Sequence, residues 1–161
     1  MDETRAWLAS EGRDLMHVAA SHLDTARNIK VQRRDSVDRI ALDNCVLTWT
    51  MIRQTTISVG GQPSEDRTYT IDVTIAMKDL IASGLTVEPD TLFADEPAYQ
   101  VRVPVRQTLE AEATSSISMD HDNPVSIAFA TLPVGTAEDG RRIATAIRHA
   151  AGLCKVPSGP F

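Results

Sequence analysis

The sequence predicts an α+β fold in which six to seven antiparallel strands lie between a helix at each end of the chain. Apolar residues recur at helical spacing over 3–23, alternate with polar residues through 37–131, and return to helical spacing over 136–155. A sheet of that many strands with one apolar face must bend or split to cover that face. We therefore expect a bent β-barrel or sandwich, in a single domain spanning 1–161, that the last helix closes.

The first helix is predicted from an apolar face at helical spacing, made of Trp7, Leu8, Leu15, Met16, Ala19 and Leu23. Gly12 lies inside this segment and can divide the helix, because glycine disfavours helix interiors. Residues 24–36 are polar and predict a connection. For the basic cluster within it we expect a solvated turn, with phosphate binding as the alternative. This cluster consists of Lys30, Arg33 and Arg34.

Alternating apolar residues predict the strands that follow. One face of the first strand comprises Cys45, Leu47, Trp49 and Met51. Ile40 and Leu42 lie in the opposite phase, so a bulge or a turn is expected near Asp43–Asn44. The loop 60–66 is rich in glycine and polar residues, and alternation resumes over 69–77. These two runs predict a long hairpin across that loop.

Shorter strands are predicted beyond the hairpin, at 85–87, 99–105, 117–119 and 125–131. Pro104 lies inside the second of these, which indicates an edge position or a bulge, because proline cannot donate a backbone hydrogen bond. The composition of 120–124 predicts a turn before the last strand.

The closing helix is predicted over 136–155, with an N-cap at Thr136 and Asp139 in the capping-box position. Arg148 and His149 lie near its C-terminal end, where cations interact favourably with the helix dipole. Small and aliphatic residues on one face predict that the helix lies close against the sheet. This face consists of Ile143, Ile147, Ala150 and Cys154.

The two cysteines are predicted to be largely buried on the same side of the core. Cys45 shares its strand face with core residues, and Cys154 lies on the buried face of the closing helix. Two buried thiols are expected in a cytosolic protein, and a disulfide in a periplasmic one. A disulfide requires Cα atoms within about 7 Å of each other, and closing so long a loop would stabilise the fold by about 4 kcal/mol.

Composition excludes several classes of function. The chain has 161 residues, of which 42% are apolar and 24% charged, as in folded domains. Its net charge of −6 opposes binding to nucleic acid. No apolar run is long enough to span a bilayer, so no transmembrane segment is expected. The acidic start, Met1–Glu3, is not a secretory signal, so the chain as written is expected in the cytoplasm, or in the periplasm if Met1 replaces a removed signal.

No residue is assigned a catalytic, cofactor-binding or metal-binding role. The segment 120–123 offers oxygen ligands in a calcium-loop-like order but lacks the glycine and the distant glutamate of an EF-hand, so a turn is expected. The loop 60–67 carries two acids and one arginine, so phosphoinositide binding is disfavoured. The histidines contain no pair at the helical spacing of a zinc site. They are His17, His22, His121 and His149.

The order of elements resembles the pleckstrin-homology-like fold, a bent β-barrel capped by one C-terminal helix. The chain also resembles a group of uncharacterised bacterial proteins with that fold, through Trp7-Leu8, the strand segment Cys45-Val-Leu-Thr-Trp49 and the helix from Arg142 to Cys154. This resemblance implies a fold and no activity. The N-terminal helix departs from a minimal pleckstrin-homology domain.

Three hypotheses of function follow. The first is a non-catalytic binding or interaction module that uses an open sheet edge or the face near Pro104 to contact a partner protein or a second copy of the chain. The alternative is a carrier that holds a small apolar ligand in a β-barrel cavity. The third is a hydrolase that uses His121 or His149, for which the sequence supplies no supporting constellation.

Overall fold

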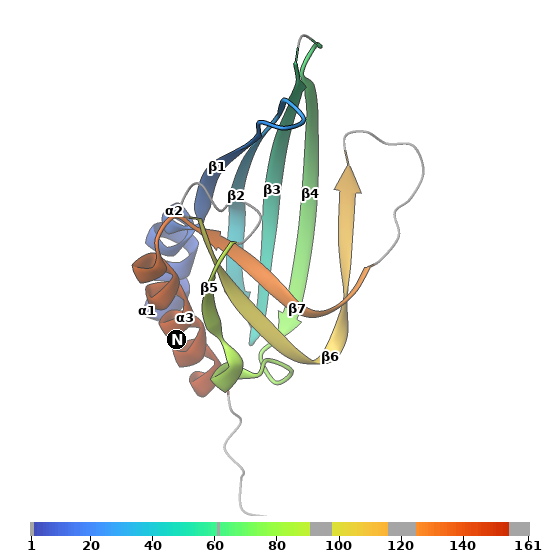
Figure 1. Cartoon of the computed structure of the whole chain (residues 1–161). Helices are drawn as coiled ribbons and strands as arrows, with labels where there is room; N and C mark the ends of the chain where they lie inside the picture. The colour runs from blue at the N-terminus through green and yellow to red at the C-terminus, as the bar shows by residue number, and fades with distance from the viewer. Residues whose placement is uncertain (1, 61, 91–97, 116–124, 155–161) are drawn as a thin grey trace, which may run out of the picture.

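The computed structural model describes residues 2–60, 62–90, 98–115 and 125–154, with side chains described outside 107–128 (Figure 1). The helical elements are α1 (Asp2–Trp7), a π-helical turn (Leu8–Gly12), α2 (Arg13–Leu15), a 3-10 turn (Ala82–Gly84) and α3 (Ala137–Leu153). The strands are β1 (His17–Asp24), β2 (Ile29–Asp43), β3 (Val46–Val59), β4 (Glu65–Ala76), β5 (Thr86–Pro89), β6 (Tyr99–Ser115) and β7 (Val125–Val134). The fold is therefore α+β with antiparallel strands between terminal helical segments, as predicted.

The strands form two antiparallel sheets that meet along β6 (Figure 1). β1 to β4 form a meander of hairpins, and β6 pairs with β5 and β7. The C-terminal end of β6 also pairs with β4, from Tyr69↔Ser115 to Asp72↔Glu112. The β6–β7 register shifts after Pro104, which confirms the predicted irregularity. In the described part of the chain β1 and β7 are not paired, so the sheets do not close into a barrel.

The N-terminal helix is shorter than predicted. Helical structure ends at Leu15, after the π-helical turn that ends at Gly12, and residues 17–24 form β1 instead of continuing the helix. Val18 and Ala20 face inward and pack against Ala98, while the backbone of β1 pairs along the whole strand with β2. This pairing and burial override the weak helical periodicity of the segment.

The basic cluster lies in β2 and not in the predicted turn. Lys30 and Arg34 are exposed, whereas the alternation of the strand turns Arg33 inward. The Arg33 side chain is 5% exposed and forms ion pairs with Asp35 and Asp90. The expectation of a solvated turn is therefore wrong, because residues 29–43 form one continuous strand.

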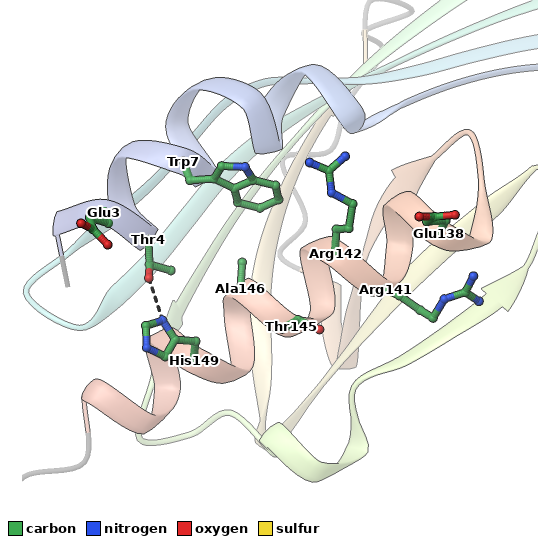
Figure 2. A pocket seen from close by; sticks show the side chains of 9 residues that line it. All are labelled: Glu3, Thr4, Trp7, Glu138, Arg141, Arg142, Thr145, Ala146 and His149. Atoms are coloured by element: carbon green, nitrogen blue, oxygen red, sulfur yellow. Dashed lines mark hydrogen bonds between the residues drawn. The ribbon is translucent and has the colours of Figure 1, made fainter.

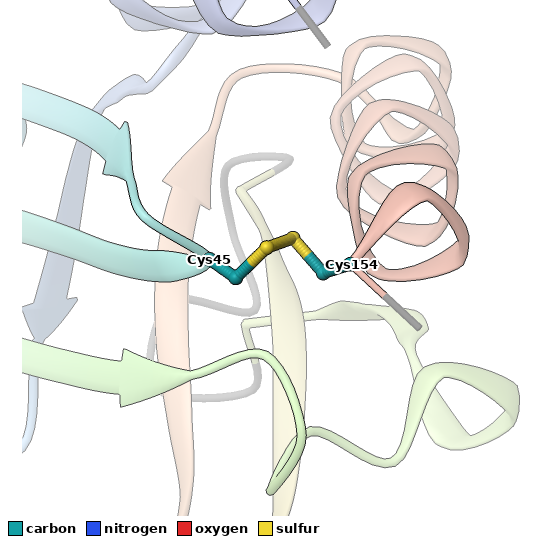
Figure 3. The surroundings of a disulfide bond; sticks show 2 residues. All are labelled: Cys45 and Cys154. Atoms are coloured by element: carbon teal, nitrogen blue, oxygen red, sulfur yellow. A yellow bond between two sulfur atoms is a disulfide. The ribbon is translucent and has the colours of Figure 1, made fainter. Parts of the chain in front are cut away.

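A two-residue turn, Asn44–Cys45, joins β2 to β3. Both residues have positive φ, 48° and 61°, which is the pattern of a type I′ hairpin turn. The predicted break near Asp43–Asn44 is thus a turn. Cys45 lies in this turn and not on the strand, and it forms a disulfide with Cys154 at the end of α3, with the Cα atoms 5.6 Å apart (Figure 3). Both cysteines are partly buried and pack against the core, so they lie on the same side of the core as predicted and form the disulfide that the sequence left open, although they are less buried than predicted.

The closing helix α3 begins and packs as predicted, over Ala137–Leu153 instead of 136–155. The backbone N–H of Asp139 donates to Thr136 Oγ1 at 3.1 Å, which caps the helix. Ile143, Ile147 and Ala150 are fully buried. Gly140 allows close approach to β5, because an added Cβ would lie only 2.7 Å from Cγ1 of Val87.

The core lies between the sheets and the helices. Its largest fully buried side chains come from both sheets and from both ends of the chain: Leu8, Met16, Leu47, Ile75, Val101, Val103, Leu132, Val134, Ile143 and Ile147. The predicted β3–β4 hairpin and the last strand are present. The weak strand predicted at 117–119 and the turn predicted at 120–124 lie outside the described residues. Among the helices that the structure describes, none has the length and apolar character needed to cross a membrane.

Candidate functional site

A groove of about 830 Å³ separates the N-terminal helix α1 from the closing helix α3 (Figure 2). It brings together side chains from the first and last helices of the fold. Its lining consists of Glu3, Thr4, Trp7, Glu138, Arg141, Arg142, Thr145, Ala146 and His149. A cavity of this volume is in the range of ligand-binding sites, although both of its ends carry charged groups.

The α1 wall of the groove is positioned by the core beneath it. Leu8 is fully buried, which turns the preceding Trp7 toward α3, half-buried in the groove. Gly12 lies under the indole, and an added Cβ would be 3.1 Å from Trp7 Cζ3. The indole Nε1 donates to Glu11 Oε2 at 3.1 Å, which directs the polar edge of the ring away from α3. The sequence of α1 thus presents the apolar face of Trp7 to the groove.

The α3 wall is the face of the helix opposite its buried stripe. The lining positions follow a spacing of three and four residues from Glu138 to His149, so they form one surface beside α1. Ala146 is the smallest of them and faces Trp7 across the groove (Figure 2). Because the Ile143 and Ile147 side chains fix the rotation of α3 against the core, this polar face is held toward α1.

Two contacts join the walls. Thr4 Oγ1 and His149 Nδ1 form a hydrogen bond of 2.8 Å. The Arg142 guanidinium carbon lies 5.7 Å from the centroid of the Trp7 ring, a cation–π distance. The Arg142 side chain is half exposed, and its ion pair with Asp139 is a long one, with 4.0 Å between Nη1 and Oδ1. The Arg142 cation is therefore accessible from solvent. The groove therefore combines an apolar centre with accessible cations at one end and a hydroxyl–imidazole pair at the other.

A second polar cluster is buried on the inner face of β2 and β3. Arg53 donates two hydrogen bonds to the Asp35 carboxylate, at 2.9 and 2.8 Å. Arg33 Nε lies 3.2 Å from the same carboxylate, and Arg33 Nη2 pairs with Asp90. The hydrogen bonds with Asp35 raise the pKa of Arg53 above its ordinary value. Its contribution to stability is therefore fully present at neutral pH and is lost only as the pH rises through strongly alkaline values.

This buried cluster leaves little room for a ligand. The cavity beside Asp35 and Arg53 has a volume of about 10 Å³, enough for roughly one water molecule. The four charged side chains neutralise one another in pairs. The cluster therefore joins β2, β3 and the residue after β5, and we assign it a structural role.

The residues considered from the sequence are dispersed. His149 lies near the C-terminal end of α3, as expected, and in addition lines the groove and forms a hydrogen bond with Thr4. His17 bonds the Asp14 carbonyl at 2.8 Å, and His22 lies on β1. His121 and the segment 120–123 lie outside the described residues. Within the described ranges, no three histidine, cysteine or acidic side chains gather as a metal site would need.

The loop predicted over 60–67 is shorter in the structure, because Glu65 and Arg67 lie on β4, and the arginine is paired with an acidic side chain. Arg67 Nε donates to Glu65 Oε1 at 2.8 Å, and this hydrogen bond raises the pKa of Arg67.

Sequence reasoning missed the groove itself. Trp7 belongs to the predicted first helix and Arg142 lies outside the predicted buried face of the closing helix, but nothing in a linear pattern indicates that these two residues meet.

Comparison of the chain with protein-family models, with curated proteins and with solved structures finds no match.

Proposed function

We propose that this protein is a non-catalytic interaction module that binds a segment of a partner protein in the α1–α3 groove. The observation that carries the proposal is the apolar face of Trp7 and Ala146 between accessible arginines and polar groups. Tryptophan and arginine are the residue types that dominate binding energy at protein interfaces, and an apolar centre with a polar rim is the usual arrangement of such sites.

The chemistry of the groove specifies what the segment should carry. An apolar side chain would pack on the Trp7 indole and Ala146, where removal from water favours binding. A carboxylate on the same segment would bond Arg142 or Arg141, since guanidinium groups bind carboxylates through paired hydrogen bonds. Arg141 is exposed and lines the groove, so its guanidinium is accessible to such a group.

The test selects binding peptides from a displayed random library on the immobilised protein and on two variants. Arg142→Glu reverses the charge next to Trp7. Arg102→Glu is the matched control, because Arg102 is also about half exposed and lies 3.9 Å above an aromatic ring, that of Phe129, outside the groove.

Peptides enriched on the wild type and on Arg102→Glu, rich in acidic and apolar residues and lost on Arg142→Glu, are the expected result. Equal capture by all three proteins would place binding elsewhere on the surface. A selection that yields no peptide above background would contradict the proposed function.

A further inference from the structure

We propose that the Cys45–Cys154 disulfide is a redox-sensitive tether that holds the α3 wall of the groove in its binding position. This inference rests on the proposed function for its consequence in binding, but its structural part can be tested without a ligand.

Both walls of the groove are attached to one turn of the sheet. Arg5 of α1 forms an ion pair with Asp43, the last residue of β2. Two residues further on, Cys45 bonds covalently to Cys154, which follows α3 (Figure 3). The Asn44–Cys45 turn is itself fixed, because the Cys45 carbonyl accepts a hydrogen bond from Met77 N at 2.8 Å. At this end of the groove α1 and α3 are therefore attached to the same turn, in addition to their packing on the core.

The end of α3 has few other attachments. Ala151 is its last buried residue, Leu153 is 45% exposed, and an added Cβ at Gly152 would meet nothing within 4 Å. Arg148 donates to the carbonyls of Ala82 and Leu85, which holds the helix on its other side up to that point. The next residue is His149, which bonds Thr4 across the groove. Ala150 and Ala151 stay packed on the core, so loss of the disulfide should free residues 152–154 first, loosen the last turn of α3 and thereby weaken the His149–Thr4 contact.

The backbone conformation of Cys45 indicates that a cysteine stands at this position because of the disulfide that it forms. The second residue of a type I′ turn is commonly glycine, because its φ is positive, and Asn-Gly is the preferred pair. Cys45 occupies that position with φ of 61°, a conformation that non-glycine residues rarely adopt. A cysteine here is unfavourable for the turn by itself, and the disulfide accounts for its presence.

A dithiol can reduce the Cys45–Cys154 bond by thiol–disulfide exchange. The reductant transfers two electrons and two protons to the S–S bond, which breaks to give the Cys45 and Cys154 thiols, while the dithiol closes to a disulfide. The groove would thus be in its binding position in an oxidising compartment and loosened in a reducing one.

The experiment measures amide hydrogen exchange in the full chain over seconds to minutes. Cys45→Gly removes the tether and supplies the residue that the turn prefers. Asn44→Gly places the same residue in the same turn and keeps the disulfide, so it is the matched control. We expect amides of 149–154 to exchange about tenfold or more faster in Cys45→Gly and in the dithiol-treated wild type, with β3 still protected.

Equal exchange rates for the amides of 149–154 in Cys45→Gly and Asn44→Gly would contradict the proposal that the disulfide acts as a tether. Loss of β3 protection in the same window would also overturn it, because the disulfide would then act on the whole fold. A peptide selected on the wild type should bind at least about fivefold more weakly to Cys45→Gly, and equally to Asn44→Gly. Faster exchange with unchanged peptide affinity would keep the tether and refute the groove as the binding site.

Discussion

Side chains on the inner face of the β2–β3 hairpin are buried at both of its ends, but they are apolar at one end and charged at the other. Near the Asn44–Cys45 turn it carries Ile40, Leu42, Leu47 and Trp49, each no more than 2% exposed. Further from the turn it carries Arg33 and Asp35, 5% and 2% exposed. The first end is stabilised by apolar burial against the helices and the second by ion pairs. Burial alone therefore does not indicate which residue type occupies an inward position.

Substitutions at the two ends should therefore destabilise the fold by different mechanisms and by different amounts. At the apolar end each side chain contributes through its own contacts, so loss of one leaves a cavity of limited cost. At the charged end, removal of one side chain leaves its partner buried and unpaired. The fold then loses stability, because the desolvation penalty of that charge is no longer offset. Asp35 is the centre of this cluster, since both Arg33 and Arg53 contact its carboxylate.

The largest effect is expected for Asp35→Ala. The substitution leaves two arginines facing an inner surface without their shared carboxylate, and we expect it to lower the free energy of unfolding by about 3–5 kcal/mol. Urea denaturation followed by circular dichroism measures this. Asp72→Ala is the control, because Asp72 is exposed on the neighbouring strand, where it accepts a hydrogen bond from the Thr50 hydroxyl. A similar loss for both variants would mean that the buried cluster has no special role.

Leu47→Ala should have a smaller effect, of about 2–4 kcal/mol, because it removes buried methyl groups and leaves an apolar cavity without any unpaired charge. Leu47 is fully buried near the turn. The same denaturation measurement applies. A loss below about 1 kcal/mol would show that the apolar end collapses around the change and is less tightly packed than the charged end.

Gly140→Ala tests the helix that covers the apolar end. The added methyl would clash with Val87, so we expect a loss of about 1 kcal/mol after the helix-propensity gain of alanine is counted. Gly152→Ala is matched to it in the same helix, has free space around the new methyl, and should leave stability unchanged or raise it. Thermal unfolding of both variants gives the comparison, and equal midpoints would contradict close packing of α3 on β5.

Much of the fold is determined by local pattern. The capping of α3 by Thr136, its buried stripe, the β3–β4 hairpin and the irregularity at Pro104 are visible in the sequence, because each depends on residues near one another in the chain. The extent of the first helix is not, because the residues from His17 onward have only weak helical periodicity and gain more from pairing with β2.

The sequence by itself determined the α+β order, the alternation of the strands and the face of α3 that meets the sheet. Tertiary structure alone decided that Arg33 turns into the core with Asp35 and Asp90, that Cys45 meets Cys154, and that Trp7 lies beside Arg142. The physical reason is that periodicity reports which face of an element is buried. Which faces meet depends on contacts between segments far apart in the chain, and these contacts form both the groove and its tether.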